Sequence, residues 1–241
     1  MSGVFIAEGD LVVERAIKAG YVLHSILVDG KRTRPMPVSV PGSVPVYAAG
    51  PDVLVHITGY HLHRGMLACF YRRPVPAASQ LLSDPQIVTT VLVEGVNNPT
   101  NLGVILRCAA GLGVDAFLLD PTCCDPLYRR SGRVSMGEAY ALPYARIDRF
   151  PAGSAVVSTA GIQMLALTPS ADAEDISELK LGPSDRVAIM VGAEGPGLSE
   201  AALEASDRQL RIPMSGAVDS INVGSAAAVA FYAVMQARRT L

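Results

Sequence analysis

Apolar and polar residues follow one another along the chain in two successive patterns that predict alternating strands and helices. In residues 1–84, short apolar runs predict strands, and apolar residues three or four positions apart predict helices. The predicted strands are residues 4–7, 25–28, 44–48 and 65–71. One helix is expected to begin at the N-cap candidate Asp10 and to end at Gly20, and a second to cover residues 52–57. This order of elements is typical of a small α/β domain.

Residues 85–241 show a longer alternation, led by a β-branched and almost wholly apolar run at residues 86–94. Such a run is typical of a strand that is buried on both faces in a parallel sheet. The other predicted strands are residues 116–119, 155–158, 164–167, 186–192 and 209–212, and the predicted helices are residues 100–112, 199–205 and 224–239. Strands that alternate with helices in this way favour a parallel sheet covered on both faces.

A proline-containing segment separates the two patterns. Residues 74–84 contain two prolines among small residues, and the segment ends in an Asp-Pro pair. Such sequences are typical of linkers. We therefore expect an N-terminal domain over residues 1–84, with the linker at about residues 74–84, and a second domain over residues 85–241.

Composition excludes several classes of protein. Of the 241 residues, 50% are hydrophobic and 17% are charged, with a net charge of −2, so we do not expect disorder over most of the chain. The longest uninterrupted apolar run, residues 226–235, is much shorter than the ~18 residues that a membrane span needs. The first residues show no secretory signal pattern. The cysteines and histidines lack metal-ligand spacing, so we expect a cytoplasmic protein with reduced thiols and no metal site.

Arg107 is the first candidate for chemistry in the second domain. It lies in a predicted helix among apolar neighbours, with no acidic residue four positions away, so it is suited to bind a phosphate or a carboxylate. The alternative is an arginine that reaches from the helix to water. The same cluster, residues 94–103, contains Asn101, which is expected near the start of the helix and is either a cap or a site residue.

Two further clusters follow predicted strands. Residues 191–199 contain three glycines and a proline, which allow the backbone to approach a ligand closely, and Glu194 is their only charge. In residues 212–224, Ser220 and Asn222 are expected to point to the same side of an extended segment. Each cluster is a weak signal when it is taken alone.

A G-x-G-x-x-A match at residues 111–116 suggests a different class of protein, a nucleotide-dependent oxidoreductase. A dinucleotide-binding fingerprint follows a strand and opens a helix. The match in this chain follows a predicted helix and opens a predicted strand, so we reject this interpretation.

Taken in order, the three clusters resemble those of the SpoU/TrmH family of RNA ribose 2′-O-methyltransferases, in the SPOUT class. The matching strings are N-P-x-N-L-G-x-x-x-R at residues 98–107, G-A-E-G-x-G-L-S at residues 192–199 and I-P-M-x-G-x-x-x-S-I-N-V at residues 212–223. The family usually has Leu where Ile221 stands, which is a conservative change. Residues 129–137 are similar to a basic loop of the family, and residues 1–84 more loosely resemble the substrate-binding domain of many members.

The resemblance implies a catalytic domain with a C-terminal trefoil knot that holds S-adenosylmethionine. It also implies a homodimer formed through the C-terminal domain and an RNA substrate, with ribosomal RNA favoured. The cofactor pocket would be lined by Gly192, Ile212, Met214 and Ile221. The reaction site would consist of Asn101, Arg107, Glu194, Ser220 and Asn222. The basic residues expected to contact RNA are Lys31, Arg32, Arg34, Arg64, Arg129, Arg130 and Arg133.

Three other functions stay open at this point. They are a non-catalytic RNA-binding relative of the same fold, a transfer-RNA 2′-O-methyltransferase, and methyl transfer to a base nitrogen. The complete set of reaction-site residues argues against the first, because a binding protein would not need all of them. We expect Arg107 to contact the RNA phosphate beside the acceptor ribose, with Asn101 and Glu194 orienting it. A second hypothesis is that Arg107 also helps to accept the proton of the hydroxyl, although a guanidinium is a poor base.

Overall fold

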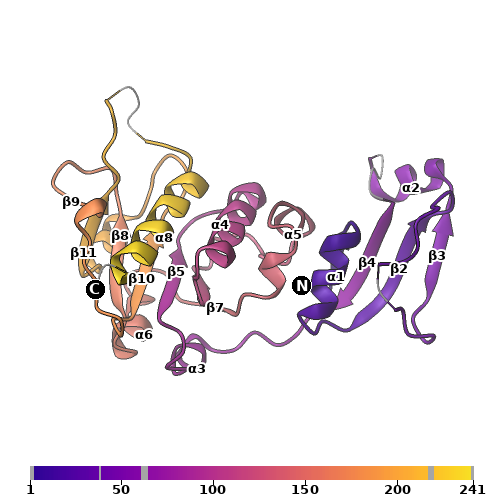
Figure 1. Cartoon of the computed structure of the whole chain (residues 1–241), viewed down its shortest axis with the longest axis horizontal. Helices are drawn as coiled ribbons and strands as arrows, with labels where there is room; N and C mark the ends of the chain where they lie inside the picture. The colour runs from indigo at the N-terminus through magenta and orange to yellow at the C-terminus, as the bar shows by residue number, and fades with distance from the viewer. Residues whose placement is uncertain (1–2, 38, 61–64, 217–219, 240–241) are drawn as a thin grey trace. The chain divides into compact units, whose positions relative to one another are not determined.

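The computed structural model describes residues 3–37, 39–60, 65–216 and 220–239. The chain forms two compact units, each with its own sheet (Figure 1). The first unit consists of Met1–Pro74 and Asp125–Ala141, and the second consists of Val75–Cys124 and Leu142–Leu241. The first change of unit falls at the start of the predicted linker. The segment Asp125–Ala141, which the sequence boundary assigned to the second domain, packs with the N-terminal residues.

A four-stranded sheet with the order β1-β4-β2-β3 forms the first unit. Its strands are β1 (Val4–Glu8), β2 (Leu23–Asp29), β3 (Val46–Ala49) and β4 (Met66–Tyr71), so the four predicted strands are confirmed. The two predicted helices are α1 (Asp10–Lys18) and α2 (Pro51–Thr58). The N-cap of α1 is Gly9 and not Asp10, since the Val13 N–H donates to Gly9 O at 3.0 Å, and the Asp10 carboxylate accepts two hydrogen bonds from Arg32.

The segment expected to be a basic loop contains the short helix α5 (Arg129–Val134), followed by the 3-10 turn η1 (Glu138–Tyr140). A Cβ added at Gly132 would lie 2.0 Å from the Tyr140 hydroxyl oxygen, so α5 and Tyr140 are in direct contact. Tyr140 joins the core of the first unit, where its ring centroid lies 5.2 Å from that of Phe5. Apolar packing of Tyr140 and the ion pairs of Arg129 and Arg133 with Glu8 together hold this segment in the first unit.

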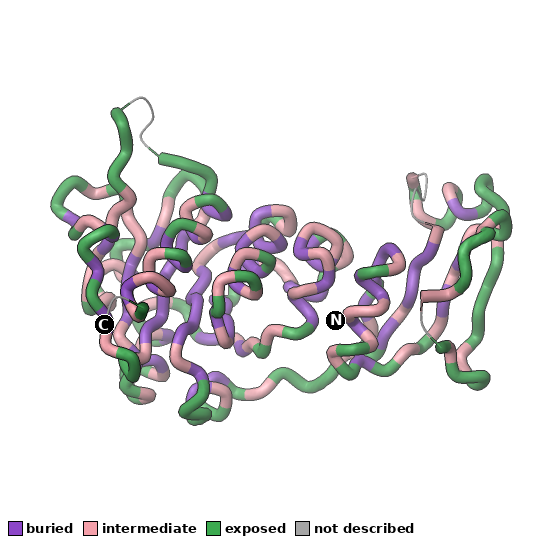
Figure 2. Tube along the Cα trace, in the orientation of Figure 1, coloured by how far each residue is buried: buried purple, intermediate pink, exposed green. Residues whose placement is uncertain are grey.

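Seven parallel strands form the sheet of the second unit, in the order β7-β6-β5-β10-β8-β11-β9. They are β5 (Thr89–Val93), β6 (Ala116–Leu119), β7 (Tyr144–Arg146), β8 (Gln163–Leu167), β9 (Glu174–Asp175), β10 (Val187–Val191) and β11 (Arg208–Arg211). Every residue of the paired strands β5 and β10 is buried, and Figure 2 shows burial concentrated along these strands. The predicted parallel sheet is thereby confirmed.

Helices cover both faces of this sheet, as expected. They are α3 (Ala78–Leu82), α4 (Pro99–Gly111), α6 (Ser154–Thr159), α7 (Glu200–Glu204) and α8 (Val223–Arg239), with the 3-10 turn η2 (Ile176–Glu178). One core cluster joins α3, α6 and α7 to Leu92 of β5. Helices α4 and α8 lie against each other on the other face, and α8 contacts β10 (Figure 1). Within the described ranges, no helix combines the length and apolar character required to cross a membrane.

Two segments of the second unit differ from the predictions. Residues 155–158, expected to form a strand, belong to α6, and Val157 is the buried residue of that helix. An apolar run this short does not distinguish a strand from a helix. Part of the predicted linker forms α3, because Ala78 and Leu82 share one helical face and are both buried in the core.

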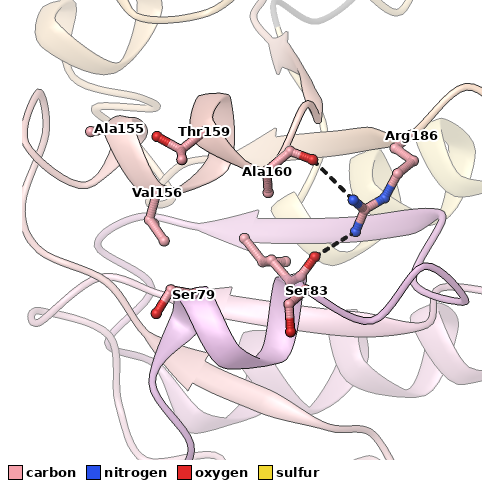
Figure 3. A pocket seen from close by; sticks show the side chains of 8 residues that line it. Ser79, Ser83, Ala155, Val156, Thr159, Ala160 and Arg186 are labelled. Carbon is pink, nitrogen blue, oxygen red and sulfur yellow. Dashed lines mark hydrogen bonds between the residues drawn. The ribbon is translucent and has the colours of Figure 1, made fainter.

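A cavity of about 460 Å³ lies beside Arg186, and residues of α3 and α6 line it (Figure 3). The Arg186 guanidinium donates to four backbone carbonyl oxygens, those of Leu82 at 2.8 Å, Ile87 at 2.9 Å, Ala160 at 2.9 Å and Asp84 at 3.3 Å. All three guanidinium nitrogens are engaged in these bonds. Arg186 therefore ties the start of β10 to the segments before β5 and after α6, which is a structural role.

Replacing this arginine is expected to destabilise the protein. Arg186→Ala should lower the free energy of unfolding by about 2 kcal/mol, because it removes several charge-assisted hydrogen bonds to partly buried carbonyl groups. Urea unfolding followed by circular dichroism measures the change. The control is Arg149→Ala at an exposed arginine, which should change stability by no more than about 0.5 kcal/mol. Equal stability of the two variants would contradict the structural role.

Candidate cofactor pocket and active site

The three sequence clusters lie at one edge of the parallel sheet. They follow β5, β10 and β11. In the sheet, β5 pairs with β10, and β8 lies between β10 and β11. In a parallel sheet the carboxyl ends of all strands meet at the same edge, which is where α/β proteins bind ligands. Residues that are far apart in the sequence can therefore meet there.

A hydrogen-bond network joins one residue from each cluster. The Asn101 side-chain amide donates to Glu194 Oε2 at 2.8 Å, across 93 positions of sequence. The Asn222 amide donates to Asn101 Oδ1 at 3.1 Å and to Glu194 Oε1 at 3.3 Å. We name Asn101, Glu194 and Asn222 the polar triad. Both oxygens of the Glu194 carboxylate accept from an amide, so the triad fixes the relative positions of three loops.

The helix ends explain why these side chains are placed for the triad. Asn98 caps α4, because its side chain accepts from the Thr100 N–H at 2.9 Å. Asn101 therefore lies inside the first turn and is not the cap, which leaves its amide for Glu194. At α8, Asn222 Oδ1 accepts from the Gly224 N–H at 2.9 Å. Asn222 thus stabilises the start of α8 through its side-chain oxygen, while its amide nitrogen donates to Asn101 and Glu194.

Backbone contacts close the loop after β10 into a tight hairpin. Gly197 N donates to Ala193 O at 3.0 Å, and Gly195 and Gly197 have φ angles of 97° and 74°. A Cβ added at Gly192 would lie 2.1 Å from the Gly197 carbonyl carbon and 2.2 Å from Leu198 N. The loop can close in this way only with glycine at position 192. We name residues 192–199 the glycine loop.

The glycine loop forms one wall of a cavity of about 580 Å³. The four residues expected to hold the cofactor all line this cavity: Gly192, Ile212, Met214 and Ile221. Three of the expected reaction-site residues line it as well: Glu194, Ser220 and Asn222. The structure therefore brings seven of these nine residues to one cavity.

Six lining residues lie outside the three sequence clusters. They are Leu167, Thr168, Pro169, Ala171, Arg211 and Ala226. The first four end β8 or follow it, and their place at the edge depends on the insertion of β8 between β10 and β11. Arg211 is the last residue of β11, and its Nε donates to Ala173 O at 3.1 Å. The sequence signal for the first five is that they stand at the ends of predicted strands, whereas Ala226 lies near the start of α8.

Arg107 and Asn101 do not line the cavity. Asn101 is 7% exposed and reaches the site through the triad. Arg107 lies on the exposed side of α4, and the described part of the chain offers it no hydrogen bond or ion pair. Asn101 and Glu194 bond to each other and not to Arg107. Its guanidinium donors are thus unused within the described residues.

The basic residues expected to bind RNA differ in their surroundings. Arg32 donates to both carboxylate oxygens of Asp10, at 2.9 and 2.8 Å, and its side chain is only 9% exposed. Arg129 and Arg133 form ion pairs with Glu8, which is buried in the first unit. The expected RNA-contact residues that are exposed are Lys31, Arg34 and Arg130. Arg64 lies outside the described residues.

A buried carboxylate supports the loop that follows β5. Asp120, at the end of β6, accepts hydrogen bonds from the N–H groups of Gly95, Thr122 and Cys123 and from the Thr122 hydroxyl. Burial by itself raises the pKa of Asp120, but these hydrogen bonds outweigh it and the pKa lies below its usual value. Burial also raises the pKa of the Cys123 thiol. Among the described residues, no group of three or more His, Cys, Asp and Glu is placed to hold a metal ion.

Comparison with known sequences identifies close relatives of the chain. A sequence model of the SpoU rRNA Methylase family matches residues 88–232, more than half of the chain. An uncharacterized tRNA/rRNA methyltransferase of Mycobacterium bovis is 43% identical over 229 residues, which cover 94% of this chain and 79% of that protein. The 23S rRNA (guanosine(2553)-2′-O)-methyltransferase of Bacillus subtilis is 26% identical over 236 residues, covering 96% of this chain and 88% of that protein.

Solved structures share the fold over nearly the whole chain. The SpoU methyltransferase AviRb from Streptomyces viridochromogenes, solved in complex with AdoMet, has a TM-score of 0.82 and 21% identity and covers 98% of this chain and 90% of its own. An RNA 2′-O ribose methyltransferase has a TM-score of 0.80 and 27% identity, with coverage of 99% and 90%. The matched region contains all three sequence clusters. The chain therefore belongs to the SpoU rRNA methylase family.

Proposed function

We propose that this RNA methyltransferase of the SpoU family transfers a methyl group from S-adenosylmethionine to a ribose 2′-hydroxyl of ribosomal RNA. One observation carries the proposal: the polar triad joins three distant segments beside a cavity that the expected cofactor residues line. A protein that only bound RNA would not require these residues at one sheet edge.

The cavity fits S-adenosylmethionine in size and chemistry. Its volume of about 580 Å³ falls within the roughly 300–1,000 Å³ of small-molecule sites. Ile212 and Ile221 supply apolar surface for an adenine ring, and the glycine loop exposes backbone groups for hydrogen bonds. Glu194 and Arg211 are the charged lining residues, which suits a ligand with both a positive and a negative end. Two cofactor-bound relatives of the same fold support this assignment.

The side chains around the cavity have distinct tasks in the proposed reaction. S-Adenosylmethionine supplies an electrophilic methyl group on a sulfonium when it is bound. The acceptor hydroxyl must be held in line and must lose its proton during the attack. Ser220 is placed on the cavity to contact ribose hydroxyls, and the polar triad keeps its loop and the glycine loop in register. Arg107 binds the neighbouring RNA phosphate through its exposed guanidinium.

The relatives support RNA ribose as the acceptor, and the best-characterised of those named here favours ribosomal RNA. The Bacillus subtilis relative is a 23S rRNA 2′-O-methyltransferase, and the Mycobacterium bovis relative is described only as a tRNA/rRNA methyltransferase. Exposed Lys31, Arg34 and Arg130 supply positive charge in the first unit for phosphate contacts. With a net charge of −2, binding must depend on such local patches and should weaken as salt rises.

A homodimer through the second unit is part of the proposal. Helix α8 turns one face toward α4, and Val229 and Tyr232 on its outer side are 39% and 53% exposed. Exposed apolar side chains on one helix face are suited to pair with a second copy. Sedimentation should therefore give twice the mass of the chain, and a monomer at micromolar concentration would contradict the dimer.

Two measurements test the proposed function. Calorimetric titration with S-adenosylmethionine should give one site per chain, and transfer of a labelled methyl group should favour ribosomal RNA over transfer RNA. Preferred labelling of transfer RNA would overturn the assigned substrate but leave the chemistry. If the protein binds RNA but does not bind S-adenosylmethionine, either alone or in the presence of RNA, it is a non-catalytic relative.

A further inference from the structure

Glu94 holds both ends of the glycine loop. Its backbone N–H donates to Val191 O at 2.9 Å, where the loop leaves β10. Its carboxylate accepts from the Ser199 N–H, 2.8 Å from Oε2, and from the Ser199 hydroxyl, 2.8 Å from Oε1. Glu94, directly after β5, is therefore bonded to Val191 just before the glycine loop and to Ser199 at its end.

The partner of this carboxylate is itself fixed. Ser199 is the N-cap of α7, and its Oγ accepts from the Ala202 N–H at 3.2 Å while its own hydrogen is donated to Glu94. The Ser199 N–H and hydroxyl both donate to Glu94, and an ionised carboxylate can accept both hydrogen bonds because each of its oxygens is an acceptor. The pair thus fixes the point where the glycine loop becomes helix.

The residue after Glu94 extends the contact. A Cβ added at Gly95 would lie 3.2 Å from Ala193 Cβ, so the loop packs against the end of β5. The tip of the glycine loop is bonded separately, through Glu194 to Asn101. The glycine loop is therefore held at its two ends by Glu94 and near its tip by α4. Glu94 itself does not line the cavity.

We propose that Glu94 is a positioning residue for cofactor binding: it clamps the glycine loop so that the wall of the cavity is formed before S-adenosylmethionine arrives. This inference rests on the proposed function for the identity of the ligand. Preorganisation of this kind strengthens binding because less order must be imposed on the loop when the ligand binds. Glu94 acts through Ser199 and touches neither cofactor nor substrate in this account.

Hydrogen exchange of the free protein tests the clamp without any ligand. Amide hydrogens of residues 193–195 and 197–199 should exchange at least about tenfold faster in Glu94→Ala than in the wild type, since a charge-assisted hydrogen bond to Ser199 is lost. Ser199→Ala keeps the backbone bond and loses the hydroxyl bond, so its change should be smaller. Unchanged exchange of these amides in Glu94→Ala would overturn the clamp.

Cofactor affinity tests the consequence. Glu94→Ala should raise the Kd and the KM for S-adenosylmethionine about tenfold, while kcat at saturating cofactor stays within about twofold. Glu94→Gln should stay within about threefold of the wild type, because its carbonyl oxygen accepts from Ser199 N and its amide can donate to Ser199 Oγ. The loss of affinity in the Glu94→Ala/Ser199→Ala double variant should be smaller than the sum of the two single losses, since both changes break the same Glu94–Ser199 contact.

Arg186→Ala is the matched control for a loss of stability. It lies at the opposite end of β10 and should leave the affinity for S-adenosylmethionine and the exchange of the glycine loop unchanged. An equal loss of affinity in this control, or wild-type affinity in Glu94→Ala, would overturn the positioning role. If the wild type itself does not bind S-adenosylmethionine, the proposed function fails, and the exchange experiment still decides whether Glu94 clamps the loop.

Discussion

Arg107→Ala is expected to lower the rate of RNA methylation at saturating S-adenosylmethionine by about a hundredfold or more, with no change in the affinity for the cofactor. Arg107 is exposed on α4, does not line the cavity, and has no hydrogen-bond or ion-pair partner among the described residues. Its proposed partner is the phosphate beside the acceptor ribose. Loss of that contact lets the hydroxyl move out of line, and small displacements of a reacting group cost about a hundredfold in rate.

Two comparisons sharpen this prediction. Arg107→Lys keeps the charge but cannot bind a phosphate with two parallel hydrogen bonds, so its rate should lie between those of the wild type and Arg107→Ala. Arg149→Ala removes another exposed arginine of the same unit and should leave the rate unchanged. Single-turnover rates and cofactor titrations of the variants supply the data. Normal turnover by Arg107→Ala would contradict the assigned role.

Gly192→Ala should raise the Kd for S-adenosylmethionine by about a hundredfold. The added Cβ would meet backbone atoms of Gly197 and Leu198 at 2.1 to 2.3 Å, and no rotation of a side chain can relieve such a contact. The glycine loop must then open, which displaces the wall of the cavity. Overpacking of this kind costs about 1–3 kcal/mol, and the upper end corresponds to about a hundredfold in affinity.

Gly111→Ala is the matched control for this change. Gly111 ends α4, and an added Cβ there has nothing within 4 Å. The control should bind S-adenosylmethionine as the wild type does, and both variants should remain folded by circular dichroism. Wild-type affinity in Gly192→Ala would show that the glycine loop is not part of the cofactor pocket.

Much of the site could be predicted because its residues stand directly after strands. A parallel sheet places the ends of β5, β10 and β11 at one edge, which is why three clusters that each follow a strand meet there. The resemblance to the SpoU/TrmH family supplied the roles of the residues. The polar triad joins the three clusters by hydrogen bonds, because Asn101, Glu194 and Asn222 each come from a different cluster.

The features that were missed depend on contacts between distant segments. Nothing local in the sequence places β8 between β10 and β11, so the lining residues after β8 were not recognised. The pairing of Arg32 with Asp10 was equally hidden, and a cluster of loop arginines therefore looked more available to RNA than it is. The short helices α3 and α6 were missed because five or six residues do not define a period.

The chemical position of the transferred methyl group tests the central claim most directly. Ribosomal RNA is incubated with the protein and methyl-labelled S-adenosylmethionine, hydrolysed with alkali, and the products are identified by mass spectrometry. A 2′-O-methyl group blocks attack of the 2′-oxygen on the adjacent phosphate, so the account predicts the label in an alkali-resistant dinucleotide. Label on a base in alkali-released mononucleotides, or no transfer to RNA that the protein binds together with cofactor, would contradict it.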